Sequence, residues 1–120
     1  MTIDLSKLSQ HAGHLTYAEE KDLLCTFYTS LVKRHQDIVE AVRLNNWQHF
    51  KALTHGLKSS SLYYGARPLH LCCEQGEQLV DTKQLGSDVI QKWLADFTQH
   101  SYAAQCALAE VIKQLDTARD

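Results

Sequence analysis

At Tyr64-Gly65-Ala66-Arg67-Pro68 one predicted helix ends and the next one begins. Glycine is favoured just past the C-terminus of a helix, where the backbone turns left-handed. Proline costs about 3 kcal/mol inside a helix but little in the first helical turn. The boundary between the two helices must therefore lie between Gly65 and Pro68, and the two helices meet in a very short antiparallel hairpin.

Upstream of this hairpin the sequence predicts two more helix starts. Thr16-Tyr17-Ala18-Glu19 matches a capping box, so a helix is expected to begin at Tyr17. Its apolar period runs to Asn45-Asn46, either as one long helix or as two with a break near His35. Asn46 can cap the helix that Gly65 ends. A short additional helix over about Asp4 to Gln10 is expected to cap the end of a larger bundle.

Downstream, the helix that starts near Pro68 fades in the polar stretch Asp81-Thr82-Lys83-Gln84. Gly86-Ser87 restarts the pattern, and a long last helix follows, either straight or kinked near Ser101. Each helix carries one apolar stripe, which four helices can turn toward a shared core. The sequence therefore predicts an all-α protein: an up-down-up-down four-helix bundle with a short extra N-terminal helix, forming a single domain over residues 1–120.

Composition excludes several classes of function. Twelve basic and 14 acidic residues give a net charge of -2 without a basic run, so nucleic acid is not expected as a partner. No apolar run approaches the roughly 20 residues needed to cross a bilayer, so a soluble, cytosolic protein without membrane contact is expected. The four cysteines form no C-x-x-C pair and are interpreted as reduced, mostly buried thiols. Trp47, Trp93 and Phe97 are assigned to packing.

The stretch Thr54-His55-Gly56-Leu57-Lys58-Ser59-Ser60-Ser61 carries the chemistry. Residues three apart on a helix are neighbours, so Lys58 is expected beside the His55 imidazole. Helical periodicity turns Phe50, Leu53, Leu57 and Tyr64 to one side of this helix. It turns the following residues to the other, exposed side: Gln48, Lys51, Ala52, His55, Lys58, Ser59 and Leu62.

A lone exposed histidine is most often a solvated residue without a role, but the surroundings of His55 favour a function. Gly56 costs roughly 1 kcal/mol relative to alanine in a helix, and Ser59-Ser60-Ser61 adds three mediocre helix formers. Small side chains either leave the imidazole accessible to another protein or allow a neighbouring helix to approach. A neutral imidazole is a ready nucleophile. The Lys58 ammonium would offset the charge of a captured phosphoryl group by about 1 kcal/mol.

His55 to Leu69 resembles the histidine-containing phosphotransfer (HPt) domain family, whose pattern runs His-x-Leu-Lys-Gly-Ser-Ser/Ala-x-x-x-Gly-Ala-x-x-Leu. The histidine, Leu57, Lys58, the small residues that follow and Gly65-Ala66 all match at the family's spacing. Ser59 departs from the pattern, since glycine is usual there. Its side chain is still small, and a hydroxyl could hydrogen-bond the phosphate or the ring.

The resemblance implies that His55 accepts a phosphoryl group from a receiver-domain aspartate and passes it to another receiver in a multistep two-component phosphorelay. The partners would be receiver domains of a hybrid histidine kinase and of a response regulator. The chain itself would need no cofactor, since Mg²⁺ belongs to the receiver. Lys58 would neutralise the phosphoryl group and Ser59 would permit docking. The expected docking residues are Gln48, Lys51, Ala52, Gly56 and Leu62.

Other interpretations remain open at this point. A helical-bundle adaptor could bind a receiver or kinase domain without carrying phosphate. Seven histidines and four cysteines raise the question of a metal, but His11-x-x-His14 falls in a predicted turn and the other histidines lack ligand spacing, so no metal is expected. No glycine-rich nucleotide loop is present, so the chain is not expected to be an ATP-dependent kinase. The chain could be a free-standing carrier or a domain of a larger hybrid kinase; the initiating methionine and the polar C-terminal end favour a complete small protein, and we expect a monomer.

Overall fold

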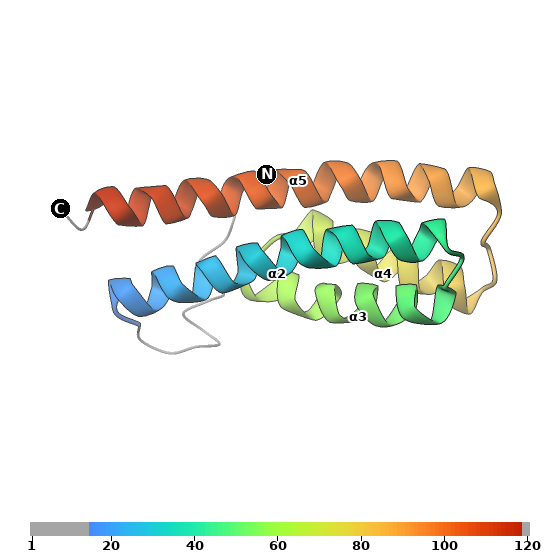
Figure 1. Ribbon diagram of the computed structural model, residues 1–120, viewed down its shortest axis with the longest axis horizontal. Coiled ribbons are helices and arrows are strands. Elements are labelled where there is room, and N and C mark those ends of the chain that lie inside the picture. The colour runs from blue at the N-terminus through green and yellow to red at the C-terminus, as the bar shows by residue number, and fades with distance from the viewer. Residues whose placement is uncertain (1–14, 119–120) are drawn as a thin grey trace.

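The computed structural model describes residues 15–118, and within them the chain forms four α-helices (Figure 1). With the labels of Figure 1, these are α2 (Tyr17–Arg43), α3 (Trp47–Tyr63), α4 (Arg67–Asp81) and α5 (Ser87–Ala118). Each helix packs against the next along the chain, and α5 closes the ring against α2. The predicted all-α, up-down-up-down bundle is confirmed. The helix expected over Asp4 to Gln10 lies outside the described residues.

Local capping sets the helix ends where the sequence predicted them. The Thr16 hydroxyl accepts from the Glu19 backbone N–H at 3.2 Å, and the Glu19 carboxylate accepts from the Thr16 N–H at 3.2 Å. The Asn46 side chain accepts from the His49 backbone N–H at 3.3 Å, at the start of α3. Gly65 has φ of 70°, a left-handed conformation that favours glycine and ends α3.

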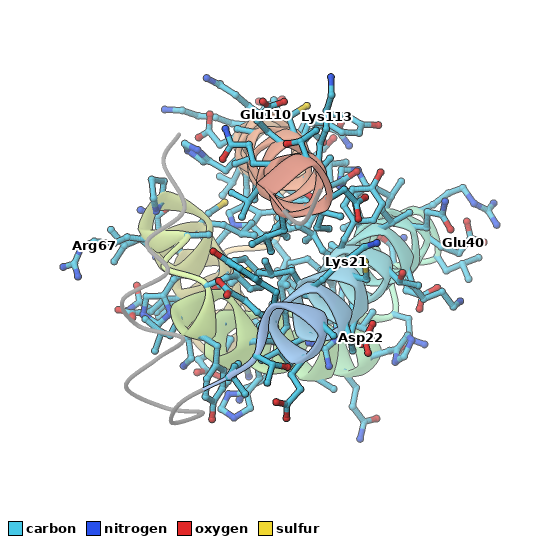
Figure 2. The ribbon with its side chains drawn as sticks, turned by 90° about the vertical axis from the view of Figure 1, so that its left-hand side faces the viewer. Lys21, Asp22, Glu40, Arg67, Glu110 and Lys113 are labelled. Atoms are coloured by element: carbon cyan, nitrogen blue, oxygen red, sulfur yellow. The ribbon has the colours of Figure 1, made fainter. Side chains whose placement is uncertain are left out.

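The four helices differ in length, so the bundle has an uneven end. α2 has 27 residues and α5 has 32, whereas α3 has 17 and α4 has 15. The first part of α2 and the last part of α5 therefore run past the α3–α4 hairpin (Figure 1). Figure 2 looks along the bundle from this end. It shows Glu110 and Lys113 on the outer side of α5, pointing away from the other helices. Lys21 of α2 pairs with Asp116 of α5 at 2.5 Å and joins the two overhanging segments. Within residues 15–118, no helix is both long and apolar enough to cross a bilayer.

An aromatic stack fills the half of the core that lies between α3 and α5. Trp93 stacks on Phe97 with ring centres 5.0 Å apart, and Phe50 meets Trp93 edge-on at 5.0 Å. The Trp93 indole N–H donates to the Cys72 carbonyl of α4 at 2.8 Å, so this large side chain is held by a hydrogen bond as well as by packing. Trp47 packs edge-on against Phe50. The assignment of these aromatic residues to packing is confirmed.

Gly76 allows α4 to lie directly against this stack. A Cβ atom built at Gly76 would lie 2.9 Å from Cζ2 and 3.0 Å from Cε2 of Trp93, closer than carbon atoms can approach. Because Trp93 is buried and hydrogen-bonded, its ring has little room to move away. The absence of a side chain at position 76 therefore sets how closely α4 packs on α5, and in which rotation.

His35 and Ser101, where a break and a kink were considered, form a buried contact between two continuous helices. His35 Nδ1 lies 2.7 Å from the Ser101 hydroxyl, and the Gln105 amide donates to the same hydroxyl at 3.2 Å. The imidazole also packs on Phe97 and Tyr102. α2 continues through His35 as α-helix and α5 through Ser101. Polar residues that looked like helix interruptions thus connect α2 to α5.

The cysteines differ in burial more than the sequence predicted. Cys72 and Cys73 are buried, but Cys25 is half-buried and Cys106 is exposed, so the interpretation of mostly buried thiols holds for the adjacent pair alone. Burial raises the pKa of Cys72 to about 12 and raises that of Cys73 as well. Both thiols are therefore protonated at neutral pH and act as small apolar side chains.

Replacing Gly76 with alanine should destabilise the bundle even though alanine is the better helix former. The methyl group would overlap the Trp93 ring, and overpacking of this kind costs about 1–3 kcal/mol. Chemical denaturation of Gly76→Ala measures the loss. Gly56→Ala is the matched control in the middle of α3, since its Cβ would meet the Arg34 guanidinium at 3.6 Å, an ordinary contact. The control should gain about 1 kcal/mol, and equal effects of the two substitutions would contradict the role assigned to Gly76.

Acid should weaken the fold through His35. Burial lowers the pKa of this imidazole in the folded protein, so below about pH 6.5 the unfolded chain binds a proton that the folded chain does not. The free energy of unfolding should fall as the pH drops, by at most about 1.4 kcal/mol per pH unit for this one group. Denaturation of wild type and His35→Gln between pH 7.5 and 5.5 tests this. The variant should lose less stability, and parallel curves would refute the assignment.

Candidate functional site

One long side of α3 faces solvent, and it carries the residues that helical periodicity assigned to it. Phe50 and Leu57 are buried on the opposite side, in the core. His55 projects from the middle of the exposed side, with 65% of its side chain accessible. Lys58, one turn further on, is half-buried. The remaining members of the predicted face are all exposed: Gln48, Lys51, Ala52, Ser59 and Leu62.

A carboxylate from the next helix joins His55 to Lys58. Glu77 of α4 lies with one oxygen, Oε1, 3.0 Å from His55 Nδ1 and 3.2 Å from Lys58 Nζ. The Glu77 side chain is only 12% exposed, so it is held in place, whereas the imidazole that it contacts is open to solvent. Lys58 was predicted to lie beside the imidazole. In the structure the Lys58 ammonium and the imidazole contact the same carboxylate oxygen.

Two further contacts hold α3 against α4 around this cluster. Lys51, nearly two turns before Lys58, pairs with Asp81 at 2.5 Å, and this hydrogen bond raises the pKa of the lysine. The His70 ring donates through Nδ1 to the Lys58 backbone carbonyl at 2.9 Å. The backbone that carries Lys58 is therefore fixed to α4 on the side away from solvent.

The Glu77 contact determines which nitrogen of His55 can react. A carboxylate accepts hydrogen bonds and has no proton to donate, so the proton of the neutral ring lies on Nδ1, facing Glu77. Nε2 then keeps its lone pair. A carboxylate that holds one ring nitrogen in this way fixes both the tautomer and the ring orientation. The His55 ring thus has a fixed orientation, with its unprotonated nitrogen at Nε2.

The other side of His55 is lined by small residues facing α2. Gly56 turns toward the Arg34 guanidinium, which donates to the Ser60 hydroxyl at 3.0 Å. Ser61 is buried. The Ser59 hydroxyl donates to the backbone carbonyl of His55 at 3.4 Å, and not to its ring. A methyl group would fit at position 56, so close helix approach does not explain this glycine.

The remaining histidines do not form a metal site in the part of the chain that the structure describes. Residues 15–118 contain no group of three or more His, Cys, Asp or Glu side chains that could hold a metal ion. His49 is exposed on α3. His70 is half-buried and bonded to α3. His11 and His14 lie outside the described residues.

Comparison with known protein families identifies the family of this bundle. The family model described as "Hpt domain" matches residues 22–118, which is most of the chain. The chain belongs to the Hpt domain family. No curated protein and no solved structure gave a significant match. The resemblance seen from His55 to Leu69 therefore extends over most of the described bundle, from residue 22 in α2 to the end of α5.

Hpt domains are phosphotransfer intermediates of phosphorelays, where they interact with receiver domains, and they are not kinases. The histidine and lysine of this Hpt domain were found from the sequence because they lie three residues apart on one helix. Glu77 was missed, since it lies 22 residues from His55 on another helix. The opposite charges of Lys51 and Lys58 on α3 and of Asp81 and Glu77 on α4 are the signal that could have indicated the contact between these helices.

Removing Glu77 should release the imidazole and slow phosphotransfer. Without the carboxylate, the proton of the neutral ring is no longer held on Nδ1. A charge-assisted hydrogen bond lost from the reacting ring should cost on the order of tenfold in rate. Nitrogen-15 NMR of the His55 ring and the rate of transfer from a phosphorylated receiver measure the two effects in Glu77→Ala.

Glu77→Gln should fall between wild type and Glu77→Ala, because its carbonyl oxygen can accept the same bond without the charge. Glu74→Ala is the matched control: it removes a carboxylate one turn earlier on α4 that lies near His70. The control should leave the His55 tautomer unchanged. Wild-type ring shifts and rate in Glu77→Ala would rule out the positioning role.

Proposed function

We propose that this Hpt domain accepts a phosphoryl group on Nε2 of His55 from an aspartyl phosphate of a hybrid kinase's receiver domain, and passes it to the receiver of a response regulator. The observation that carries the proposal is the His55–Glu77–Lys58 cluster. It combines an exposed ring, a carboxylate that accepts a hydrogen bond from Nδ1 and so keeps the ring proton there, and an ammonium one turn away.

In the proposed step the Nε2 lone pair attacks phosphorus while the bond from phosphorus to the aspartate oxygen breaks. The aspartate leaves as a carboxylate and carries away the bonding electron pair. No proton has to leave the nucleophile, since Nε2 carries none. The ring becomes a positively charged phosphoimidazole with its proton still on Nδ1, and Glu77 stabilises this charge through the existing hydrogen bond. In the reverse step an aspartate oxygen of the second receiver attacks phosphorus, and Nε2 leaves with its electron pair.

Lys58 supplies the countercharge for the phosphoryl oxygens. Its ammonium starts on Glu77, one turn from the ring, and its flexible stem allows it to move to the phosphoryl group once that group is bound. For a partly exposed ion pair this exchange is worth about 1 kcal/mol or less. So small a stabilisation suits a carrier, because a tightly held phosphoryl group would not be passed on.

The exposed side of α3 supplies a surface for the receiver. Gln48, Lys51 and Ala52 precede His55 on this side, and Leu62 follows it with 43% of its surface accessible. Ser59 is small enough to let a partner approach the ring. The apolar parts of these side chains would be covered on docking, as in the centre of other protein interfaces.

Labelling tests the proposal directly. Incubation with a phosphorus-32-labelled, phosphorylated receiver domain should transfer label to the protein in an acid-labile, base-stable form. His55→Gln should take up no label. His49→Gln is the matched control, since it removes another exposed histidine of the same helix, and it should be labelled like wild type.

The result also separates a carrier from an adaptor. Tight binding of the receiver without any label on wild type would favour the adaptor and refute the carrier. Label that persists in His55→Gln would place the phosphoryl group on another residue and refute the assignment of His55.

A further inference from the structure

Gly56 leaves a gap on the side of His55 that faces α2, and no packing constraint requires that gap. The three atoms nearest to a Cβ at this position all belong to the Arg34 guanidinium, at 3.6–3.7 Å. Alanine would therefore fit and would improve the helix. Gly76 differs, because its missing side chain is demanded by Trp93. Packing within the free protein therefore does not explain the glycine next to His55.

Arg34 forms the inner wall of this gap. Its guanidinium lies half-buried between α2 and α3, where Nη1 donates to the Ser60 hydroxyl at 3.0 Å. That hydroxyl in turn donates to the Leu57 carbonyl at 3.3 Å, so the guanidinium is anchored to the backbone of α3. A guanidinium has five N–H donors, and one such bond leaves most of them for another group.

Three cations border His55, and they differ in whether they are already neutralised. Lys58 pairs with Glu77 and Lys51 pairs with Asp81, both on the α4 side. On the α2 side, no carboxylate of residues 15–118 lies within ion-pair distance of Arg34. The positive charges on the α4 side of the His55 ring are therefore neutralised by carboxylates. The charge of Arg34, on the α2 side next to Gly56, is not neutralised by any carboxylate of the described residues.

We propose that Arg34, reached through the gap at Gly56, is a specificity-determining residue that binds a carboxylate of the docked receiver. This inference rests on the proposed function, in which the donor group is an aspartate within the receiver's acidic pocket. Guanidinium and carboxylate match in a two-pronged geometry that lysine cannot reproduce. A larger side chain at position 56 would cover the guanidinium, which explains why glycine stands there.

The test compares phosphotransfer from one phosphorylated receiver domain, chosen because it labels wild type, to variants of the full chain. The rate is measured against receiver concentration at low and high salt. Arg34→Gln should raise the half-saturating receiver concentration about tenfold, flatten its salt dependence, and leave the maximal rate within about twofold. Arg34→Lys, which keeps the charge, should fall between wild type and Arg34→Gln.

Lys33→Gln is the matched control, since it removes a neighbouring exposed cation of α2 that pairs with Asp37. It should leave the half-saturating concentration unchanged. Gly56→Ala should raise that concentration although the protein becomes more stable, and denaturation curves of each variant separate docking from folding. Arg34→Gln behaving like Lys33→Gln, or losing maximal rate alone, would overturn the inference. Absence of label on wild type would instead refute the proposed function.

Discussion

The whole site depends on one shared carboxylate oxygen. Glu77 Oε1 contacts the His55 ring and the Lys58 ammonium together, and it comes from a different helix. Without it the ring and the cation are two flexible side chains on a solvent-exposed helix. With it, the ring has a defined protonation state and direction, and by the proposed function little further ordering of the ring is needed when a receiver docks. The orientation and the protonated nitrogen of the His55 ring on α3 thus depend on a residue of α4.

The position of Glu77 follows from packing on an adjoining side of the same helix, since consecutive helical residues point about 100° apart. Gly76 immediately precedes it and lies against the Trp93 ring, which is itself fixed by stacking and by the Cys72 carbonyl. Rotating α4 to relieve that contact would turn the carboxylate away from α3. The aromatic core and the His55–Glu77–Lys58 cluster therefore depend on one geometric constraint, and the tight contact at position 76 positions the cluster as well as the fold.

Helix limits and the exposed face of α3 could be predicted from sequence because both depend on neighbours along the chain. Thr16 and Glu19 cap each other, and Gly65 needs only its own backbone to end α3. The contacts between helices could not be predicted in this way. Glu77 reaches His55 only once α4 has a particular rotation, and His35 and Ser101 looked like interruptions because each is polar when viewed on its own helix. In the folded protein, contacts between helices satisfy these polar residues and hold the helices together.

The pairing of Lys58 with Glu77 has a consequence for how a loaded domain leaves its donor. Before transfer, the ammonium and the carboxylate cancel, so an acidic pocket meets a nearly neutral patch at the ring. By the proposed reaction the patch gains about two negative charges from the phosphoryl group, and the positive charge of the phosphorylated ring offsets only one of them, since the lysine charge is already cancelled by Glu77. The spent receiver, which regains its own aspartate charge, then faces like charge across the interface. Transfer would in this way promote product release and make the carrier available to its next partner.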